Sequence, residues 1–207
     1  MRQPKSRTCP IFLCLCFAIM LLTGCEKSET CVMPANVRLE EGDIVFRRGG
    51  GFTSHAVLMG DRGGQYSHVG IVAVEGGRKV IVHAVPGEPD FDGDPDRVKM
   101  ESPEEFFSSL KTDIGEVCRV ADRAAARRAA AKALEIYRRH TLFDHDYDDH
   151  DTTKMYCTEL ISYVYNCAGM PLVGSKRHRV DLPMLHANVL YPSDIHHSKK
   201  VKTIYIF

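Results

Sequence analysis

Two short runs of β-branched residues, separated by a pair of glycines, constrain the fold of this chain most strongly. The first run spans residues 69–74, the second spans residues 80–82, and Gly76-Gly77 lies between them. A hairpin-sized gap between such runs is typical of two antiparallel strands. His68 precedes the first run and His83 follows the second, so the pairing can bring two imidazoles side by side on one sheet face. The alternative is that they are two unrelated polar residues at strand ends.

A second constraint comes from the stretch Tyr156-Cys157-Thr158-Glu159-Leu160. Apolar residues recur after it at helical spacing, and Gly169 with Pro171 supplies a stop signal, so Cys157 is predicted in the first turn of a helix. Free backbone N–H groups and the helix dipole favour a thiolate there, and we expect them to lower the thiol pKa below about 8.5. The alternative is a buried, inert cysteine that packs as a small hydrophobic residue.

A nucleophilic cysteine needs an imidazole within hydrogen-bond reach and a third polar group that fixes the tautomer of that imidazole. The residue pattern offers His68 and His83 for these two places. The residue pattern is therefore compatible with a cysteine-protease-like site at Cys157, and the inert cysteine stays open as the alternative.

The remaining segments predict a single mixed α+β domain. Strands are expected at 44–46, 116–120 and 203–207, and helices at 54–59, at 102–110 and, most clearly, at 121–139, where alanine dominates. The glycine-rich bend at 49–51 lacks the Lys-Ser/Thr ending of a phosphate-binding loop, so we predict no nucleotide site there. A length of 207 residues fits one globular domain better than two.

The most polar run of the chain, residues 143–151, holds five aspartates and two histidines. Acidic residues at 144, 146 and 148 faintly resemble a calcium loop, but the glycine and glutamate that such a loop needs are replaced by Asp149 and Met155. We therefore predict an acidic loop that leads into the Cys157 helix and helps to line a cleft. No metal ion or other cofactor is predicted for this chain.

The N-terminus has the features of an export signal. Arg2, Lys5 and Arg7 precede an apolar run at 11–22, and Leu22-Thr23-Gly24-Cys25 resembles the bacterial lipobox. We expect residues 1–24 to be a signal peptide, residues 25–39 a tether lipidated on Cys25, and residues 40–207 the hydrolase domain. This places the protein at the bacterial cell envelope, anchored to a membrane through its lipid. A plain signal peptide or an uncleaved anchor is the alternative.

Charge and cysteine content limit the possible partners and the possible disulfides of this chain. Without residues 1–24 the chain has 24 basic and 27 acidic residues, which argues against a nucleic-acid partner. Four cysteines remain after the lipidated one: Cys31, Cys118, Cys157 and Cys167. If Cys157 is reactive, at most one disulfide forms, and it does not join Cys157 to Cys167, which are about 15 Å apart along one helix.

Four motifs carry a resemblance to a known family. In chain order they are Gly42-Asp43-Ile44-Val45-Phe46, Ser67-His68-Val69-Gly70-Ile71, Val82-His83-Ala84 and Tyr156-Cys157-Thr158-Glu159-Leu160. They resemble the circularly permuted papain-like amidases of the YaeF/YiiX type, within the wider NlpC-type superfamily of cell-wall peptidases. The order is diagnostic, because the histidine strand precedes the cysteine helix, whereas ordinary papain-like enzymes have the reverse order. The resemblance covers roughly residues 40 to 170.

The resemblance implies a circularly permuted papain-like fold, with an antiparallel sheet packed against helices. It also implies Cys157 as nucleophile, His68 as general base and His83 as the third, orienting residue. Many permuted members carry a glutamate at the place of His83, and His55 and Glu159 are the alternatives for that role. The residues implied beside the substrate are Tyr66, Ser67 and Tyr156.

The implied activity is hydrolysis of an amide bond, either in a cell-wall peptide or in an N-acyl or lipid amide. Two alternatives stay open at this point. A catalytically idle, lipid-anchored module would use the same cleft to hold a peptide or lipid, and an acyltransferase would pass the acyl group to an acceptor other than water.

Overall fold

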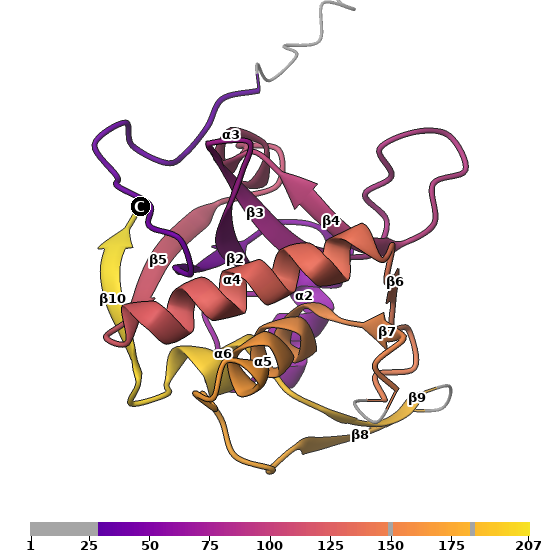
Figure 1. Cartoon of the computed structure of the whole chain (residues 1–207). Coiled ribbons are helices and arrows are strands. Elements are labelled where there is room, and N and C mark those ends of the chain that lie inside the picture. Colours follow the sequence, from indigo (N-terminus) through magenta and orange to yellow (C-terminus); the bar gives the residue numbers. More distant parts are fainter. Residues whose placement is uncertain (1–28, 149–150, 183–184) are drawn as a thin grey trace, which may run out of the picture.

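A computed structural model describes residues 29–148, 151–182 and 185–207 of the chain (Figure 1). Within this part, eight strands form one sheet in the order β10-β5-β1-β2-β3-β4-β6-β7. Neighbours are antiparallel except β6 and β7, which are parallel. The strands are β1 (Ile44–Arg48), β2 (His68–Glu75), β3 (Arg78–Val85), β4 (Arg97–Glu101), β5 (Ile114–Val120), β6 (Leu142–Phe143), β7 (Lys154–Met155) and β10 (Val201–Ile206). A separate hairpin pairs β8 (His178–Leu182) with β9 (Leu185–Val189).

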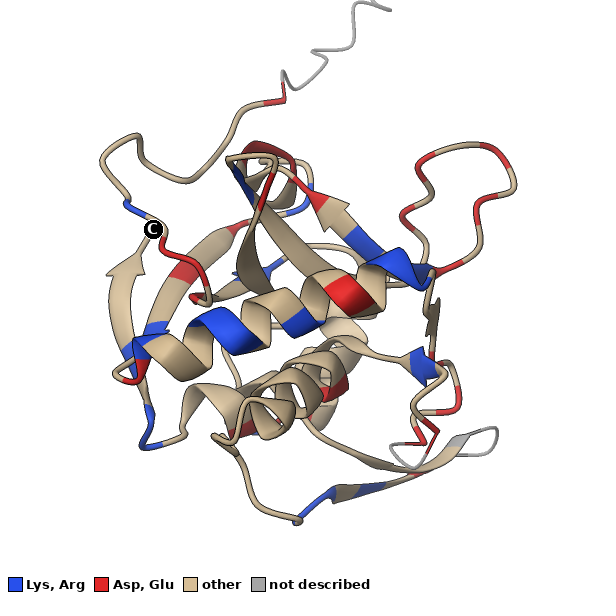
Figure 2. Cartoon of the chain, in the orientation of Figure 1, with Lys and Arg blue, Asp and Glu red and all other residues tan. Residues whose placement is uncertain are grey.

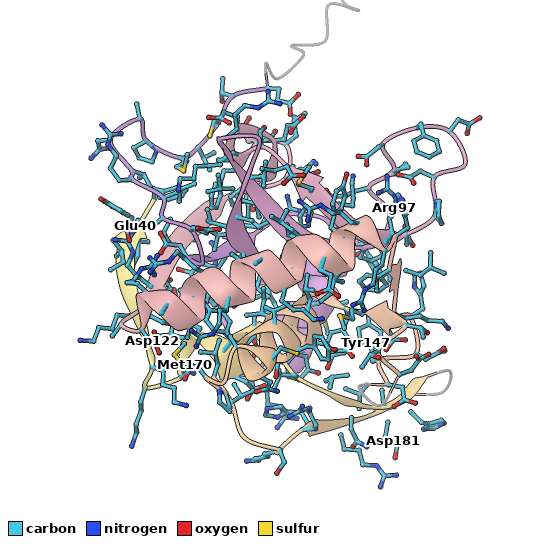
Figure 3. The ribbon with its side chains drawn as sticks, in the orientation of Figure 1. Glu40, Arg97, Asp122, Tyr147, Met170 and Asp181 are labelled. Carbon is cyan, nitrogen blue, oxygen red and sulfur yellow. The ribbon has the colours of Figure 1, made fainter. Side chains whose placement is uncertain are left out.

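Two helices pack side by side on one face of the sheet, α4 (Arg123–Arg138) and α5 (Cys157–Cys167) (Figure 1). The buried side of α4 is mostly alanine, which lets its backbone approach the strands closely. Asp122 begins this helix, because its side chain accepts hydrogen bonds from two backbone N–H groups of the first turn (Figure 3). Shorter helices are α2 (Phe52–Gly60), α3 (Pro103–Phe106) and α6 (Pro192–His196).

The other face of the sheet carries a second, smaller core around Val45, Phe106 and Phe107. The segment 29–39 packs here: Val37 is buried, and the backbone N–H of Val32 donates to the carbonyl oxygen of Phe107 over 2.8 Å. The later part of the expected tether, residues 29–39, therefore lies on the domain. Cys25 and the expected signal peptide lie outside the described residues.

The predicted α+β class, with an antiparallel sheet packed against helices, is confirmed. The hairpin predicted from the β-branched runs is β2 and β3, whose register pairs Ile71 with Val82. The predicted strands at 44–46, 116–120 and 203–207 correspond to β1, β5 and β10, and the alanine-rich helix to α4. Strand β4 and the β8–β9 hairpin were not predicted. In the described part of the chain, no helix has both the length and the apolar character needed to cross a membrane.

Basic residues gather along the outer side of α4 (Figure 2). Arg127 and Arg138 are exposed, and Arg138 pairs with Glu75 of β2 over 2.7 Å. Lys132 pairs with Glu135 on the same helix over 2.8 Å. These contacts are those of a solvated helix face.

Candidate active site

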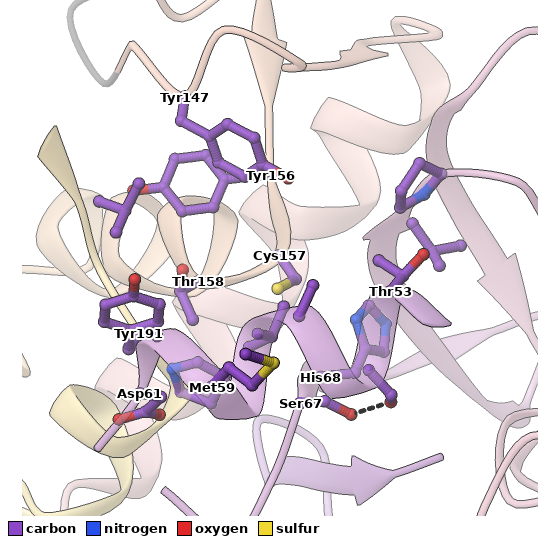
Figure 4. Close-up of a pocket in the computed structure, with 18 of the residues that line it drawn as sticks. Thr53, Met59, Asp61, Ser67, His68, Tyr147, Tyr156, Cys157, Thr158 and Tyr191 are labelled. Atoms are coloured by element: carbon purple, nitrogen blue, oxygen red, sulfur yellow. Dashed lines mark hydrogen bonds between the residues drawn. The ribbon is translucent and has the colours of Figure 1, made fainter. Parts of the chain in front are cut away.

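Cys157 and His68 line the same cavity, which has a volume of about 1260 Å³. Figure 4 shows both side chains in this cavity, Cys157 from the start of α5 and His68 from the start of β2. The other walls are α2, the loop after β3, the acidic run, the β8–β9 hairpin and the start of α6. The sheet and α5 thus bring the two sequence motifs, 89 positions apart, to one surface.

Hydrogen bonds fix the start of α5 and hence the position of Cys157. The Glu159 carboxylate accepts from the backbone N–H of Tyr156 over 3.2 Å, which places Glu159 in a helix-capping role. The Thr158 hydroxyl donates to the carbonyl oxygen of Leu190 over 2.5 Å. The Leu190 backbone N–H in turn donates to the Tyr156 hydroxyl over 3.0 Å.

His68, His83 and Glu101 form a line of contacts leading away from the cavity. Nε2 of His68 and Nδ1 of His83 are 2.9 Å apart, and Nε2 of His83 is 3.2 Å from Oε2 of Glu101. The second contact is an ion-pair distance and does not meet hydrogen-bond geometry. His83 is fully buried, and Glu101 and His68 nearly so.

The sequence was also compared with known proteins. Residues 38–205 match the family described as permuted papain-like amidase enzyme, YaeF/YiiX, C92 family. The chain belongs to this family. Its members are cysteine peptidases or amidases, so this C92 family member is a hydrolase. No curated protein matches the sequence.

A solved structure supports the same fold. The crystal structure titled as metalloprotein YiiX from Escherichia coli O157:H7 has a TM-score of 0.63 and 18% sequence identity. The match covers 82% of this chain and 98% of that one. The sequence resemblance to the YaeF/YiiX type is thereby confirmed for the fold and the family.

The contacts of this C92 family member determine where the protons lie on the two imidazoles. The ionised Glu101 carboxylate lies 3.2 Å from Nε2 of His83 and favours the tautomer with the proton on that nitrogen, which leaves His83 Nδ1 as an acceptor. His68 must then donate from Nε2, and its own Nδ1 keeps a lone pair. Glu101 therefore selects, through His83, the tautomer of His68 that has a basic nitrogen available for a thiol proton.

Burial keeps both imidazoles of this chain neutral. It lowers the pKa of His68 well below its usual 6.5, and the nearby Arg47 and His83 act in the same direction. It also lowers the pKa of His83, although the hydrogen bond and charge of Glu101 oppose the change. The same contact with His83, together with Lys111, holds the pKa of Glu101 well below its usual range despite its burial.

The expected lowering of the Cys157 pKa is contradicted. Burial raises the pKa of this thiol to about 11, and it outweighs the backbone N–H groups of Val69, Thr158 and Cys157 itself, which favour the thiolate. At neutral pH this C92 family member therefore holds a neutral thiol near a neutral imidazole. The contribution of Val69 places the sulfur near the backbone of β2, one residue after His68.

The residues expected beside the substrate occupy different places. Ser67 lines the cavity, where its hydroxyl contacts that of Ser54 in α2, and Tyr156 lines it beside Tyr147 (Figure 4). Tyr66 is not among the lining residues: it is buried and packs against Phe46 and His196. Of the alternatives for the third residue, His55 is exposed on α2 and outside the cavity lining.

Sequence reasoning missed Glu101 and Arg47. Glu101 lies on β4, and the charged and apolar residues that alternate over 97–101 were an available strand signal. Arg47 lies on β1, donates to the Phe106 carbonyl oxygen over 2.9 Å and pairs with Glu88 over 2.6 Å. The buried positive charge of Arg47 lowers the pKa of His68, of His83 and of the Cys157 thiol.

The acidic run contributes Phe143 and Tyr147 to the cavity lining. Asp144 organises the loop, because its carboxylate accepts from the backbone N–H groups of Asp146 and Asp148 over 2.9 and 2.6 Å. Residues 149 and 150, which the calcium-loop comparison included, lie outside the described residues. The described cysteines are free thiols: Cys31, Cys118, Cys157 and Cys167.

Proposed function

We propose that this C92 family member hydrolyses an N-acyl or lipid amide at the bacterial cell envelope, with Cys157 as nucleophile and His68 as general base. One observation carries the proposal. The line Glu101–His83–His68 ends at the cavity that contains Cys157, and the contacts along it favour a neutral His68 with its proton on Nε2 and a lone pair on Nδ1. A base poised in this way can activate a thiol whose own pKa is high.

The reaction follows from these positions. His68 takes the thiol proton on Nδ1 as the sulfur bonds to the amide carbonyl carbon, and the imidazolium is stabilised through His83 by the charge of Glu101. Backbone N–H groups at the start of α5 hold the oxyanion. His68 then passes its proton to the leaving amine, and water releases the acyl group from the sulfur.

The cavity lining favours an acyl chain over a short peptide. Apolar side chains of α2, including Phe52, Val57 and Met59, face the same space as Val180 and Leu190. Phe52 and Met59 are 90% and 83% exposed, which leaves apolar surface available to a ligand. A cell-wall peptide is the second substrate class. The lipobox-like stretch at Cys25 supports the envelope location and a membrane anchor.

A binding module without turnover is the second candidate function, and the raised pKa of Cys157 favours it. In that case the same cavity holds an acyl chain or peptide, and the thiol stays protonated. The two candidates differ in whether His68 activates the thiol when a carbonyl group is present.

A thiol-directed acyl probe tests the proposal. Cys157→Ala is expected to abolish both labelling and the release of amine from a panel of N-acyl amides and muropeptides. Cys167→Ala, which removes an exposed thiol from the same helix, is the matched control and should keep both. Equal labelling of the wild type and Cys157→Ala would contradict the nucleophile. Binding of acyl amides without any amine release would favour the binding module.

A further inference from the structure

Away from the catalytic cavity, three side chains of different chemistry converge on one point. Glu116 and Cys118 alternate along β5 and so lie on the same face of the sheet, and His196 reaches them from the end of α6. Nε2 of His196 is 3.1 and 3.0 Å from the two carboxylate oxygens of Glu116. The Cys118 thiol donates to Oε1 of Glu116 over 3.1 Å.

These residues do not belong to the site already described. None of them lines the catalytic cavity. Glu116 and Cys118 are 1% and 0% exposed, whereas His196 is half-buried and the neighbouring Thr203 is exposed, so the cluster is open toward the surface on one side. One ligand atom from each of the three lies within 4.8 Å of the others.

We propose that Glu116, Cys118 and His196 bind one Zn²⁺ ion. Carboxylate oxygen, imidazole nitrogen and thiolate sulfur are the three ligand types of zinc sites, and a mixed set of this kind suits zinc better than calcium or magnesium, which prefer oxygen. The ion fills the space between the three ligand atoms, and a water molecule from the side of Thr203 takes the fourth position.

The spacing of the cluster fits a tetrahedral ion. Ligands bound at normal zinc distances are roughly 3.3–3.6 Å from each other. The observed separations of 3.0 and 3.1 Å between Glu116 and its two partners need an expansion of only a few tenths of an ångström, and the third pair, Cys118 and His196, lies within 4.8 Å. Rotation of these side chains is enough for that change, since His196 lies at the last residue of a five-residue helix.

Binding is coupled to the release of one proton. The Cys118 thiol loses its proton to solvent as its sulfur bonds to the ion, because a zinc ligand binds as the thiolate. His196 binds through Nε2 and keeps a proton on Nδ1. The bound ion is then balanced by one carboxylate and one thiolate.

The proposed ion joins β5 to α6, and α6 also supplies Pro192 and Ser193 to the wall of the catalytic cavity. Zinc would therefore stabilise one wall of that cavity without touching the reacting atoms. The competing explanation is a hydrogen-bonded core in which Cys118, His196, Thr203 and Tyr66 all donate to the Glu116 carboxylate.

Zinc titration of the chelator-treated, full-length protein separates the two explanations. We expect one Zn²⁺ per chain by calorimetry, and a melting temperature raised by roughly 5–10 °C at a zinc concentration 100 times the Kd. His196→Gln should weaken binding at least about 100-fold, because even losing a residue that only orients a ligand costs about 10- to 100-fold.

Matched variants identify the ligands. His197→Gln, which changes the exposed neighbouring histidine, and Cys157→Ser, which removes the catalytic thiol, should both keep full affinity. With Co²⁺ in place of zinc, the thiolate-to-metal absorption band should persist in Cys157→Ser and disappear in Cys118→Ser. Circular dichroism of the metal-free variants checks that each is folded.

Two results would overturn the proposal. One is the absence of stoichiometric zinc binding by the wild type, which would favour the hydrogen-bonded core. The other is zinc binding that His196→Gln leaves unchanged, which would place the metal elsewhere on the chain.

Discussion

The histidine at position 83 makes the proposed line of contacts from His68 to a carboxylate one residue longer in this chain. A carboxylate at that place would contact His68 directly, whereas an imidazole has two nitrogens and needs its own partner to define its tautomer. Glu101 supplies that partner from the neighbouring strand. The negative charge that stabilises the imidazolium of His68 is therefore one side chain further away than in a direct pair.

Glu101→Gln tests this positioning role. The charge of Glu101 raises the pKa of both histidines, so its loss should lower the pKa of His68 further and move the acidic limb of kcat/KM to lower pH. At the plateau we expect kcat to fall about 10- to 100-fold, which is a part of the 10²–10⁴-fold that general-base catalysis contributes.

Asp90→Asn is the matched control for that measurement. Asp90 pairs with Lys99 and Arg97 in the same charged region but contacts neither histidine. Its loss should leave kcat and the pH profile nearly unchanged. If Glu101→Gln lowers kcat without moving the acidic limb, Glu101 has only a structural role.

The wild-type pH profile gives a second prediction at this scale. The base must be neutral to act, and burial lowers the pKa of His68 well below 6.5. Activity should therefore persist through pH 6.5 and fall only at lower pH, once His68 is protonated. A profile of kcat/KM that already falls at about pH 7 would contradict the neutral resting pair of thiol and imidazole.

At the scale of elements, the site depends on how closely β2 and β3 approach each other. A Cβ atom on Gly70 would lie 2.7 Å from Cγ2 of Ile81 and 3.3 Å from Cβ of His83. Glycine at this position therefore lets His83 lie against β2, within reach of His68. The close approach of β2 and β3 at Gly70 therefore determines both the packing of the hairpin and the distance between the two imidazoles.

Gly70→Ala is expected to destabilise the protein by about 1–3 kcal/mol through overpacking, and to reduce kcat in the fraction that stays folded because His83 is displaced. Urea unfolding and active-site titration measure the two effects separately. Gly174→Ala, where an added methyl group meets open space, should change neither. Full activity of Gly70→Ala per folded molecule would mean that the position of His83 does not matter.

Local patterns predicted the elements that carry most of the site. The β2–β3 hairpin, α4 and the start of α5 follow from residue periodicity, and with them Cys157, His68 and His83. Glu101 could not be assigned to His83 in the same way, because the loop 86–96 separates β3 from β4 and the register across it depends on tertiary packing. The raised pKa of Cys157 was missed because a helix start is visible in sequence, whereas burial is not.

At the scale of the whole molecule, the N-terminal segment limits how the domain can be attached to a membrane. In Figure 1 the start of the described chain lies near α3, at the opposite end of the molecule from the β8–β9 hairpin that walls the cavity. Three residues separate Cys25 from residue 29, and the four Cα-to-Cα steps between the two span at most about 14 Å. A lipid on Cys25 would therefore hold the α3 end of the domain close to the bilayer.

Cys25→Ser tests that attachment in a bacterial host. Without the lipid, the protein should move from the membrane fraction to the aqueous phase of a detergent partition, and incorporation of labelled palmitate should be lost, because a thioether-linked lipid needs the thiol. Cys31→Ser removes the next cysteine, which is an exposed free thiol, and should leave both readouts unchanged. Retention of Cys25→Ser in the detergent phase would show that another segment holds the protein at the membrane.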